Sequence, residues 1–269
     1  MNKIKLTPFK FREINPKIEE NKKYILNIDI EKYSTGEPLN KYWTFDFIET
    51  ISNYINFNDV KTIFDIGSRD GYQSIEFRNW FPESKIVAFE ANPHLIDTCK
   101  SVTNDYNVEV VGNAASDING KVDFYACTNV VGCSSLLEVN TNHPRSSEWY
   151  QEKITVDAIR IDDWCKNNHV DSIDLLWIDV QGAEKMVLNG IGKLLDNVKA
   201  ICTEVEIAHM YKNSILKNEL DNFLLERGFQ EVQTFHMGWQ SDGREIESLD
   251  EIAYTQGECD VIYINKKYL

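Results

Sequence analysis

Acidic and small residues follow a short apolar run in "TIFDIGSRDGYQS", residues 62–74, and could form a ligand site. Asp65, Gly67 and Gly71 stand where a buried strand would end and a helix would begin. The free N–H groups and the dipole of a helix N-terminus favour negative charge, and glycine lets a ligand approach the backbone. The spacing is GxxxG, a weaker fit to a dinucleotide than GxGxxG. The stretch therefore indicates a ligand-binding turn.

A second acid, Glu90 in "KIVAFEANP", follows Asp65 by about twenty-five residues, the spacing at which a carboxylate accepts both hydroxyls of a ribose. Such a carboxylate would also repel the extra phosphate of NADP. In "VVGNAASDING", small residues at a third strand end leave room for a flat ring. Together the three ends would hold a charged amino-acid tail, a ribose and an adenine, which fits S-adenosylmethionine.

Three further residues could act on a methyl acceptor: Asp179, Glu204 and His209. A hydroxyl acceptor must lose its proton near the transition state, which calls for a base or a metal ion. We expect Asp179 to face the acceptor and His209 to be the general base, because unperturbed histidine titrates near neutrality. A second hypothesis makes Asp179 and Glu204 oxygen ligands of a divalent cation such as Mg²⁺.

These residues need a scaffold, and apolar runs alternating with helical segments predict parallel strands joined by right-handed crossovers. We expect strands over 61–67, 85–91, 108–115, 173–180 and 198–207, helices over 72–81, 93–105, 182–195 and 216–228, and closing strands over 229–235 and 259–267.

Three regions follow from this pattern. Residues 1–57 form an N-terminal extension with an amphipathic helix over 39–55, which could cover the acceptor site or build a homodimer. Residues 58–269 form one α/β domain. Within it, about 120–164 reads as an inserted β-hairpin and loop, and loops of that length are often functional. We expect the loop to recognise substrate, with Ser134 and Ser135 lining the acceptor pocket.

The amino-acid composition limits which partners and which cellular compartment we expect for the protein. The net charge of −15 makes nucleic acid an unlikely partner, so none is expected. The six cysteines contain no CxxC pair, which favours a reducing cytoplasm over a disulfide framework. The N-terminus lacks the apolar run of a signal peptide, and no stretch is apolar for long enough to span a bilayer.

Six segments occur in the order and spacing of one known family: "FDIGSRDGYQS", "VAFEANP", "VGNAAS", "IRIDDW", "IDLLWIDVQGAEKMVLNGI" and "ICTEVE". Over about residues 58–235 the chain resembles the FkbM family of S-adenosylmethionine-dependent methyltransferases. The resemblance implies a Rossmann-like class I methyltransferase fold, a mostly parallel twisted sheet with helices on both faces. It also implies O-methyl transfer to a sugar, a glycan precursor or another small metabolite.

Cofactor contacts are expected from all three strand ends and from Asp179: Asp65, Gly67, Ser68, Arg69, Gly71, Ser74, Glu90, Ala91, Asn92, Asn113, Ala114 and Asp179. The chain departs from the family pattern in two places. Ser68, Arg69 and Asp70 replace smaller or apolar residues, and Gln181 stands where the family generally has glutamate. An NAD-dependent oxidoreductase and a catalytically silent S-adenosylmethionine-binding module remain as alternatives.

Overall fold

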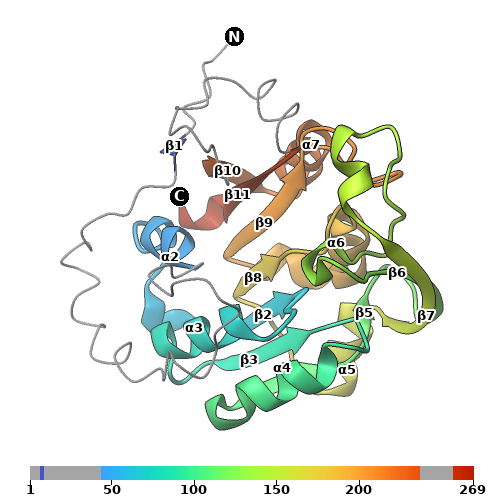
Figure 1. Ribbon diagram of the computed structural model, residues 1–269. Helices are drawn as coiled ribbons and strands as arrows, with labels where there is room; N and C mark the ends of the chain where they lie inside the picture. The colour runs from blue at the N-terminus through green and yellow to red at the C-terminus, as the bar shows by residue number, and fades with distance from the viewer. Residues whose placement is uncertain (1–6, 9–43, 237–256) are drawn as a thin grey trace.

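A computed structural model describes residues 7–8, 44–236 and 257–269 of the chain. Its main sheet has eight strands in the order β1-β10-β11-β9-β8-β2-β3-β4 (Figure 1). Their bounds are β1 Thr7–Pro8, β2 Thr62–Ile66, β3 Lys85–Phe89, β4 Val108–Val111, β8 Leu175–Ile178, β9 Ala200–Glu206, β10 Phe229–His236 and β11 Glu258–Asn265. Only β11 runs antiparallel to its neighbours, β9 and β10.

The strand order reverses between β2 and β8, because the chain first builds outward through β3 and β4 and then returns to β8. In open α/β sheets ligands bind beyond the carboxyl ends of the strands at such a reversal. The expected parallel strands and their closing pair are therefore present, and they bring the ends of β2, β3, β8 and β9 to one edge.

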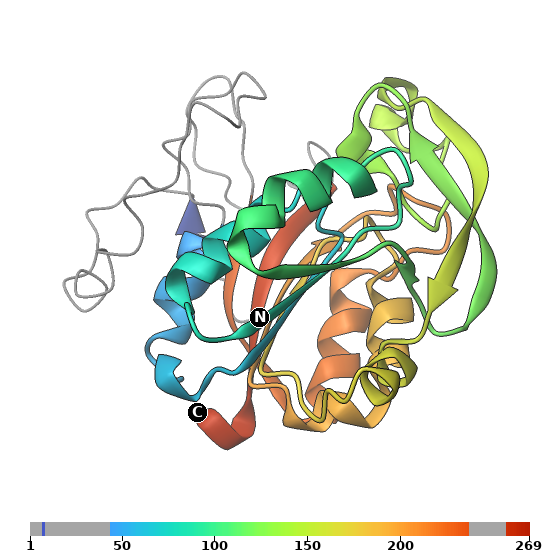
Figure 2. The same cartoon turned by 90° about the horizontal axis from the view of Figure 1, so that it is seen from below.

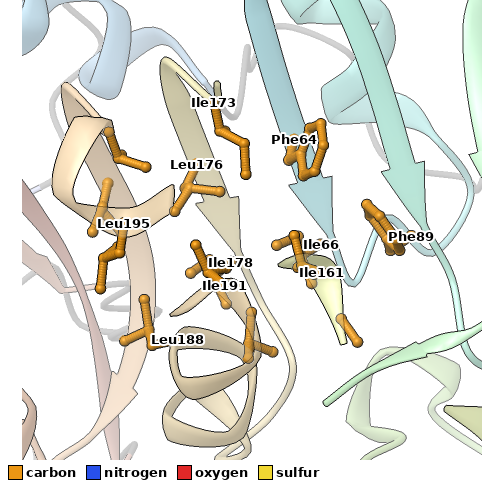
Figure 3. Close-up of a cluster of buried hydrophobic side chains, with 14 of the residues drawn as sticks. Phe64, Ile66, Phe89, Ile161, Ile173, Leu176, Ile178, Leu188, Ile191 and Leu195 are labelled. Carbon is orange, nitrogen blue, oxygen red and sulfur yellow. The ribbon is translucent and has the colours of Figure 1, made fainter. Parts of the chain in front are cut away.

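Helices cover both faces of this sheet (Figure 2). The helices are α2 Phe45–Ile51, α3 Tyr72–Trp80, α4 Ile96–Thr103, α5 Ile161–Asn167, α6 Glu184–Ile191 and α7 Lys217–Glu226. Consecutive strand side chains point to opposite faces. Ile63 accordingly joins a core with α2 and α3, whereas Phe64 joins a second core with α5, α6 and α7. Figure 3 shows part of that second core, where Ile178, Leu188 and Ile191 lie together.

A second sheet of three strands, in the order β5-β7-β6, lies beside the main one. Its strands are β5 Ala114–Ala115, β6 Gly120–Cys127 and β7 Gln151–Ile159. β6 and β7 pair antiparallel along their whole length, as expected of an inserted hairpin. The intervening loop, residues 128–150, packs Leu137 and Trp149 against Met210 and Tyr211.

Several element boundaries differ from the expected ones. The strand expected over 108–115 is two, because β4 ends at Val111 and Ala114–Ala115 belongs to the second sheet. β7 ends at Ile159 and α5 begins at Ile161, where Asp162 and Asp163 suit the positive end of the helix dipole. Residues 39–43 of the first expected helix lie outside the described residues. No helix in the described part of the chain is long and apolar enough to cross a membrane.

Candidate active site

A tight turn joins β2 to α3, and two glycines make it possible. Gly67 has φ +85° and lies against the carboxyl end of β8, where a Cβ atom would stand 1.8 Å from the backbone oxygen of Asp179. Gly71 has φ +84°, a left-handed conformation that glycine adopts without penalty. The backbone N–H of Gly67 donates to the carbonyl of Phe89 at 2.9 Å, which ties the turn to the end of β3.

Asp65 holds this turn from inside the protein. Its Oδ2 accepts hydrogen bonds from Ser68 Oγ at 2.9 Å and Ser74 Oγ at 2.5 Å. Its Oδ1 is buried with no hydrogen-bond partner. Burial raises the pKa of Asp65 to about 6, and the two serine hydrogen bonds oppose that shift. The carboxyl thus fixes both ends of the turn and favours positive charge above it.

Glu90, at the end of β3, is held by two backbone N–H groups. Oε2 accepts from Arg69 N at 2.6 Å, and Oε1 accepts from Asn92 N at 2.6 Å. Asn92 in turn accepts from His94 N at 3.1 Å, which stiffens the turn after β3. Each carboxylate oxygen keeps a further lone pair, so both can still accept the hydroxyls of a ribose. Burial raises the pKa of Glu90 to about 7.

A first cavity of about 700 Å³, open mouth included, lies over these strand ends. Seven of the expected cofactor residues line it: Gly67, Arg69, Glu90, Ala91, Asn113, Ala114 and Asp179. The other five lie behind the wall and position it: Asp65, Ser68, Gly71, Ser74 and Asn92. The structure therefore gathers the expected set at one place, although only the first group lines the cavity.

The inserted region supplies lining residues that we did not expect there. Phe124 on β6 and Ser134, Ser135 and Leu136 in the following loop line the first cavity. The two serines were expected at the acceptor pocket instead. Gln73, in the first turn of α3, was also missed. The only sequence signal was the length of the loop, because its path over the sheet depends on tertiary packing.

A second cavity, of about 750 Å³ with its mouth, adjoins the first. Both cavities are lined by Arg69, Gln73 and Asp179. The rest of the second wall combines acidic, aromatic and other side chains from α2, β8, β9, β10 and β11: Asp46, Phe47, Trp177, Ile178, Cys202, Glu204, Phe235 and Asp260. Asp179 therefore stands in the wall between two adjoining spaces.

Carboxyl groups crowd this wall. Asp179 and Glu204 are bridged by the side-chain amide of Gln181, whose Nε2 donates to Asp179 Oδ1 at 2.8 Å and to Glu204 Oε2. Burial raises the pKa of both carboxyls, and the charges of Glu258 and Asp179 raise the pKa of Glu204 further. Burial and the charge of Asp179 likewise raise the pKa of Asp260 to about 7. A carboxylate with a raised pKa is a stronger base near neutral pH.

A second acidic pair lies deeper in the protein. Glu184 and Glu206 are 1% and 2% exposed, and each has one carboxyl oxygen without a hydrogen-bond partner. Glu184 Oε1 accepts from Gly182 N at 3.0 Å, and Glu206 Oε2 accepts from Met210 N at 2.7 Å. Burial, with repulsion from Glu206, raises the pKa of Glu184 to about 8. The pair therefore supports the 181–184 turn from below.

His209 is not placed with Asp179 and Glu204. Its exposed ring shares a 3.0 Å hydrogen bond between Nδ1 and Ser214 Oγ. It lines a third cavity with Lys185 and Lys212, and is absent from the walls of the first two. Its role as general base stays a prediction without support from this geometry.

The hypothesis of a divalent cation conflicts with the position of an amide donor. A nitrogen of Gln181 lies between the carboxylates of Asp179 and Glu204, where a cation would need oxygen ligands. Among the described residues, no group of three or more His, Cys, Asp or Glu side chains is arranged to hold a metal ion. The residues present do not fit a cation, and the hypothesis stays a prediction that activity measured in a chelator would test.

Comparison with known proteins agrees with this geometry. A family model described as a methyltransferase FkbM domain matches residues 65–231. The chain is 31% identical over 190 residues to 2-O-methyltransferase NoeI of Sinorhizobium fredii, covering 67% of this chain and 76% of NoeI. It is 28% identical over 172 residues to Methyltransferase 1 of Beauveria bassiana, covering 56% of this chain and 68% of that protein.

Among solved structures, precorrin-6y C5,15-methyltransferase of Geobacter metallireducens superposes with a TM-score of 0.45 and 14% identity, over 88% of this chain and 95% of that one. That score is too low to carry an argument, so the fold rests on the strand order and the family match. The expected Rossmann-like class I fold, with S-adenosylmethionine as cofactor, is confirmed. The oxidoreductase and silent-module alternatives fall away, because this chain is a methyltransferase that belongs to the FkbM family.

Proposed function

We propose that this enzyme transfers a methyl group to a hydroxyl oxygen of a sugar or related small metabolite that binds in the second cavity. The observation that carries the proposal is the position of Asp179 in the wall shared by the two cavities. A base in that wall faces the cofactor on one side and the acceptor on the other. Reacting groups held in this way gain most of their rate from alignment.

The lining of the second cavity supports a hydroxyl-rich acceptor. Carboxylates such as Glu204 and Asp260 accept hydrogen bonds from hydroxyl groups. Phe47 and Trp177 pack edge to face with ring centroids 6.0 Å apart, and they offer an apolar wall for the C–H face of a sugar ring. NoeI, the relative at 31% identity, bears the name 2-O-methyltransferase, which agrees with transfer to oxygen.

The first cavity suits the cofactor on three counts. Glu90 presents two carboxylate oxygens at the end of β3, where a ribose diol would bind. Ala91 and Ala114 leave space for a flat ring, and Phe124 provides an apolar surface beside it. The unpartnered Oδ1 of Asp65 lies beneath the glycine turn, which favours the cationic end of the cofactor above.

S-adenosylmethionine supplies, when bound, a methyl group activated by a positively charged sulfur. Asp179 would take the proton of the acceptor hydroxyl as that oxygen bonds to the methyl carbon and the carbon–sulfur bond breaks. The loss of positive charge at sulfur would be balanced by the proton that neutralises the carboxylate of Asp179. Burial raises the pKa of Asp179 and strengthens it as a base for this step.

A methyl-transfer assay tests the proposal. Purified protein is mixed with S-adenosylmethionine labelled in its methyl group and with a panel of sugars, their 2-deoxy analogues, and amines. We expect label on a hydroxyl oxygen of at least one sugar, and loss of transfer when that hydroxyl is removed. Label found on nitrogen or carbon, or no hydroxyl acceptor that raises methyl release above background, would overturn the proposal.

A further inference from the structure

Gln181 occupies an unusual backbone position at the active-site edge. Its φ is +55°, a left-handed conformation uncommon for a residue with a side chain. Its carbonyl oxygen accepts a 2.7 Å hydrogen bond from Ser135 Oγ in the inserted loop. Ser135 is 1% exposed and lines the first cavity, so the turn is braced by the cofactor wall.

The side-chain amide of Gln181 is engaged at both its nitrogen and its oxygen. Its Nε2 donates to both Asp179 and Glu204, and its Oε1 lies 3.1 Å from the hydroxyl of Tyr211, which shares its one proton between this oxygen and the carbonyl of Cys133. The opposite amide orientation would turn the oxygen toward two carboxyl groups, which repel it. The two acids therefore fix which way the amide points.

We propose that Gln181 is a positioning residue whose amide holds Asp179 and Glu204 as one unit, with Asp179 aimed at the acceptor. This inference rests on the proposed function, since it assigns Asp179 the acceptor proton. Two buried carboxyl groups in contact repel each other whenever both are ionised. Donors placed between them remove that repulsion without adding charge.

The positioning unit extends to Tyr211 and the inserted loop. Tyr211 is fully buried, and its ring stacks on Trp149 with centroids 5.8 Å apart and planes 7° apart. Its hydroxyl also lies 2.9 Å from the carbonyl of Cys133. The loop over the first cavity thereby helps to hold the amide of Gln181 in place. The amide in turn holds the side chains of Asp179 and Glu204 in the wall of the second cavity.

Replacement of Gln181 by methionine, a side chain of similar length, tests the role of the two amide donors. Gln181→Met removes both donors, and we expect kcat to fall about 10- to 100-fold, the range of a misplaced general base. The acceptor KM and the Kd for S-adenosylmethionine should stay within about threefold, since the cofactor contacts remain. Gln230→Met, on the exposed face of β10, is the matched control with unchanged kinetics. An unchanged kcat in Gln181→Met would overturn the proposal.

Gln181→Glu gives a readout that needs no methyl acceptor. A third carboxyl would contact Asp179 and Glu204, so its pKa in the folded protein would lie above its unfolded value. The variant should therefore lose stability relative to the native protein as the pH rises from 5 to 8, as measured by urea unfolding. An equal stability difference at both pH values would show that the amide does not separate the two acids, whatever the acceptor proves to be.

Tyr211→Phe keeps the ring and removes only the hydroxyl that contacts the oxygen of the amide. We expect a smaller fall in kcat, about 3- to 10-fold, again with the cofactor Kd nearly unchanged. If Gln181→Met does not fold, Tyr211→Phe provides the test of the positioning role. A fall in cofactor affinity that accounts for the whole loss of activity would contradict a positioning role.

Discussion

The backbone N–H of Arg69 donates a 2.6 Å hydrogen bond to Oε2 of Glu90, and so joins the turn after β2 to the end of β3. Arg69 can point its N–H there because its φ is +53°, in the left-handed region. The turn after β2 and the end of β3, which we propose bind the cationic end and the ribose of the cofactor, are therefore joined directly. The same residue lines both cavities.

Replacement of Glu90 tests the ribose site. Glu90→Ala removes the acceptors of the N–H groups of Arg69 and Asn92, which are also the acceptors that we propose for two ribose hydroxyls. We expect affinity for S-adenosylmethionine to fall by about 1.5–3 kcal/mol, or roughly 10- to 150-fold, as for hydrogen bonds to a charged group. Calorimetric titration measures this, and a Kd within twofold of the native value would remove Glu90 from the site.

Gly67 and Gly228 form a matched pair for the glycine turn. Both have φ +85°, but a Cβ at Gly228 meets nothing within 4 Å, whereas one at Gly67 meets Asp179 O at 1.8 Å. Gly228→Ala should cost only the backbone strain of about 1–2 kcal/mol. Gly67→Ala should cost clearly more in urea unfolding and should abolish cofactor binding. Equal losses in the two variants would show that the turn can move away from β8.

Stability should depend on pH through Glu184. Its pKa in the folded protein is raised to about 8 by burial, so the neutral form stabilises the fold at low pH and this contribution is lost as pH rises from about 4.5 to 8. Glu184→Gln should therefore match the native protein at pH 5 and exceed it by more than about 1 kcal/mol at pH 8. Urea unfolding at the two pH values measures it, with the exposed Glu226→Gln as control. A variant that is less stable than the native protein at pH 8 would contradict this prediction.

His209→Ala tests whether the general base is His209, which the sequence predicts, or Asp179, which the geometry favours. The imidazole lines the third cavity, so we expect its removal to change kcat less than about twofold, whereas loss of a general base costs about 10²- to 10⁴-fold. Initial rates with saturating cofactor and acceptor measure this. A hundredfold loss with intact cofactor binding would return His209 to the mechanism.

The sheet was predictable because its pattern is local. The five parallel strands β2, β3, β4, β8 and β9, with the acids near their carboxyl ends such as Asp65 and Glu90, follow from apolar runs and glycine turns. The grouping of the expected cofactor residues around one cavity was predictable for the same reason, since the carboxyl ends of parallel strands must meet at one edge.

Other features depend on packing between distant segments. His209 lies five residues after Glu204, but the chain turns away after β9 and carries the ring to another cavity. Ser135 approaches Gln181 across 46 residues of sequence, and no pattern encodes that contact. The bridge from Gln181 to Asp179 and Glu204 likewise needs two strands in register, so the sequence showed only an unusual glutamine.

Single-turnover methyl transfer by Asp179→Asn tests the central claim, that Asp179 serves both cavities as the base. With enzyme in excess over methyl-labelled S-adenosylmethionine and a saturating sugar acceptor, the native protein should transfer label to oxygen. The variant should bind the cofactor within about tenfold of the native Kd and transfer label at least about 100-fold more slowly. A variant that transfers label at the native rate would contradict this account of the site.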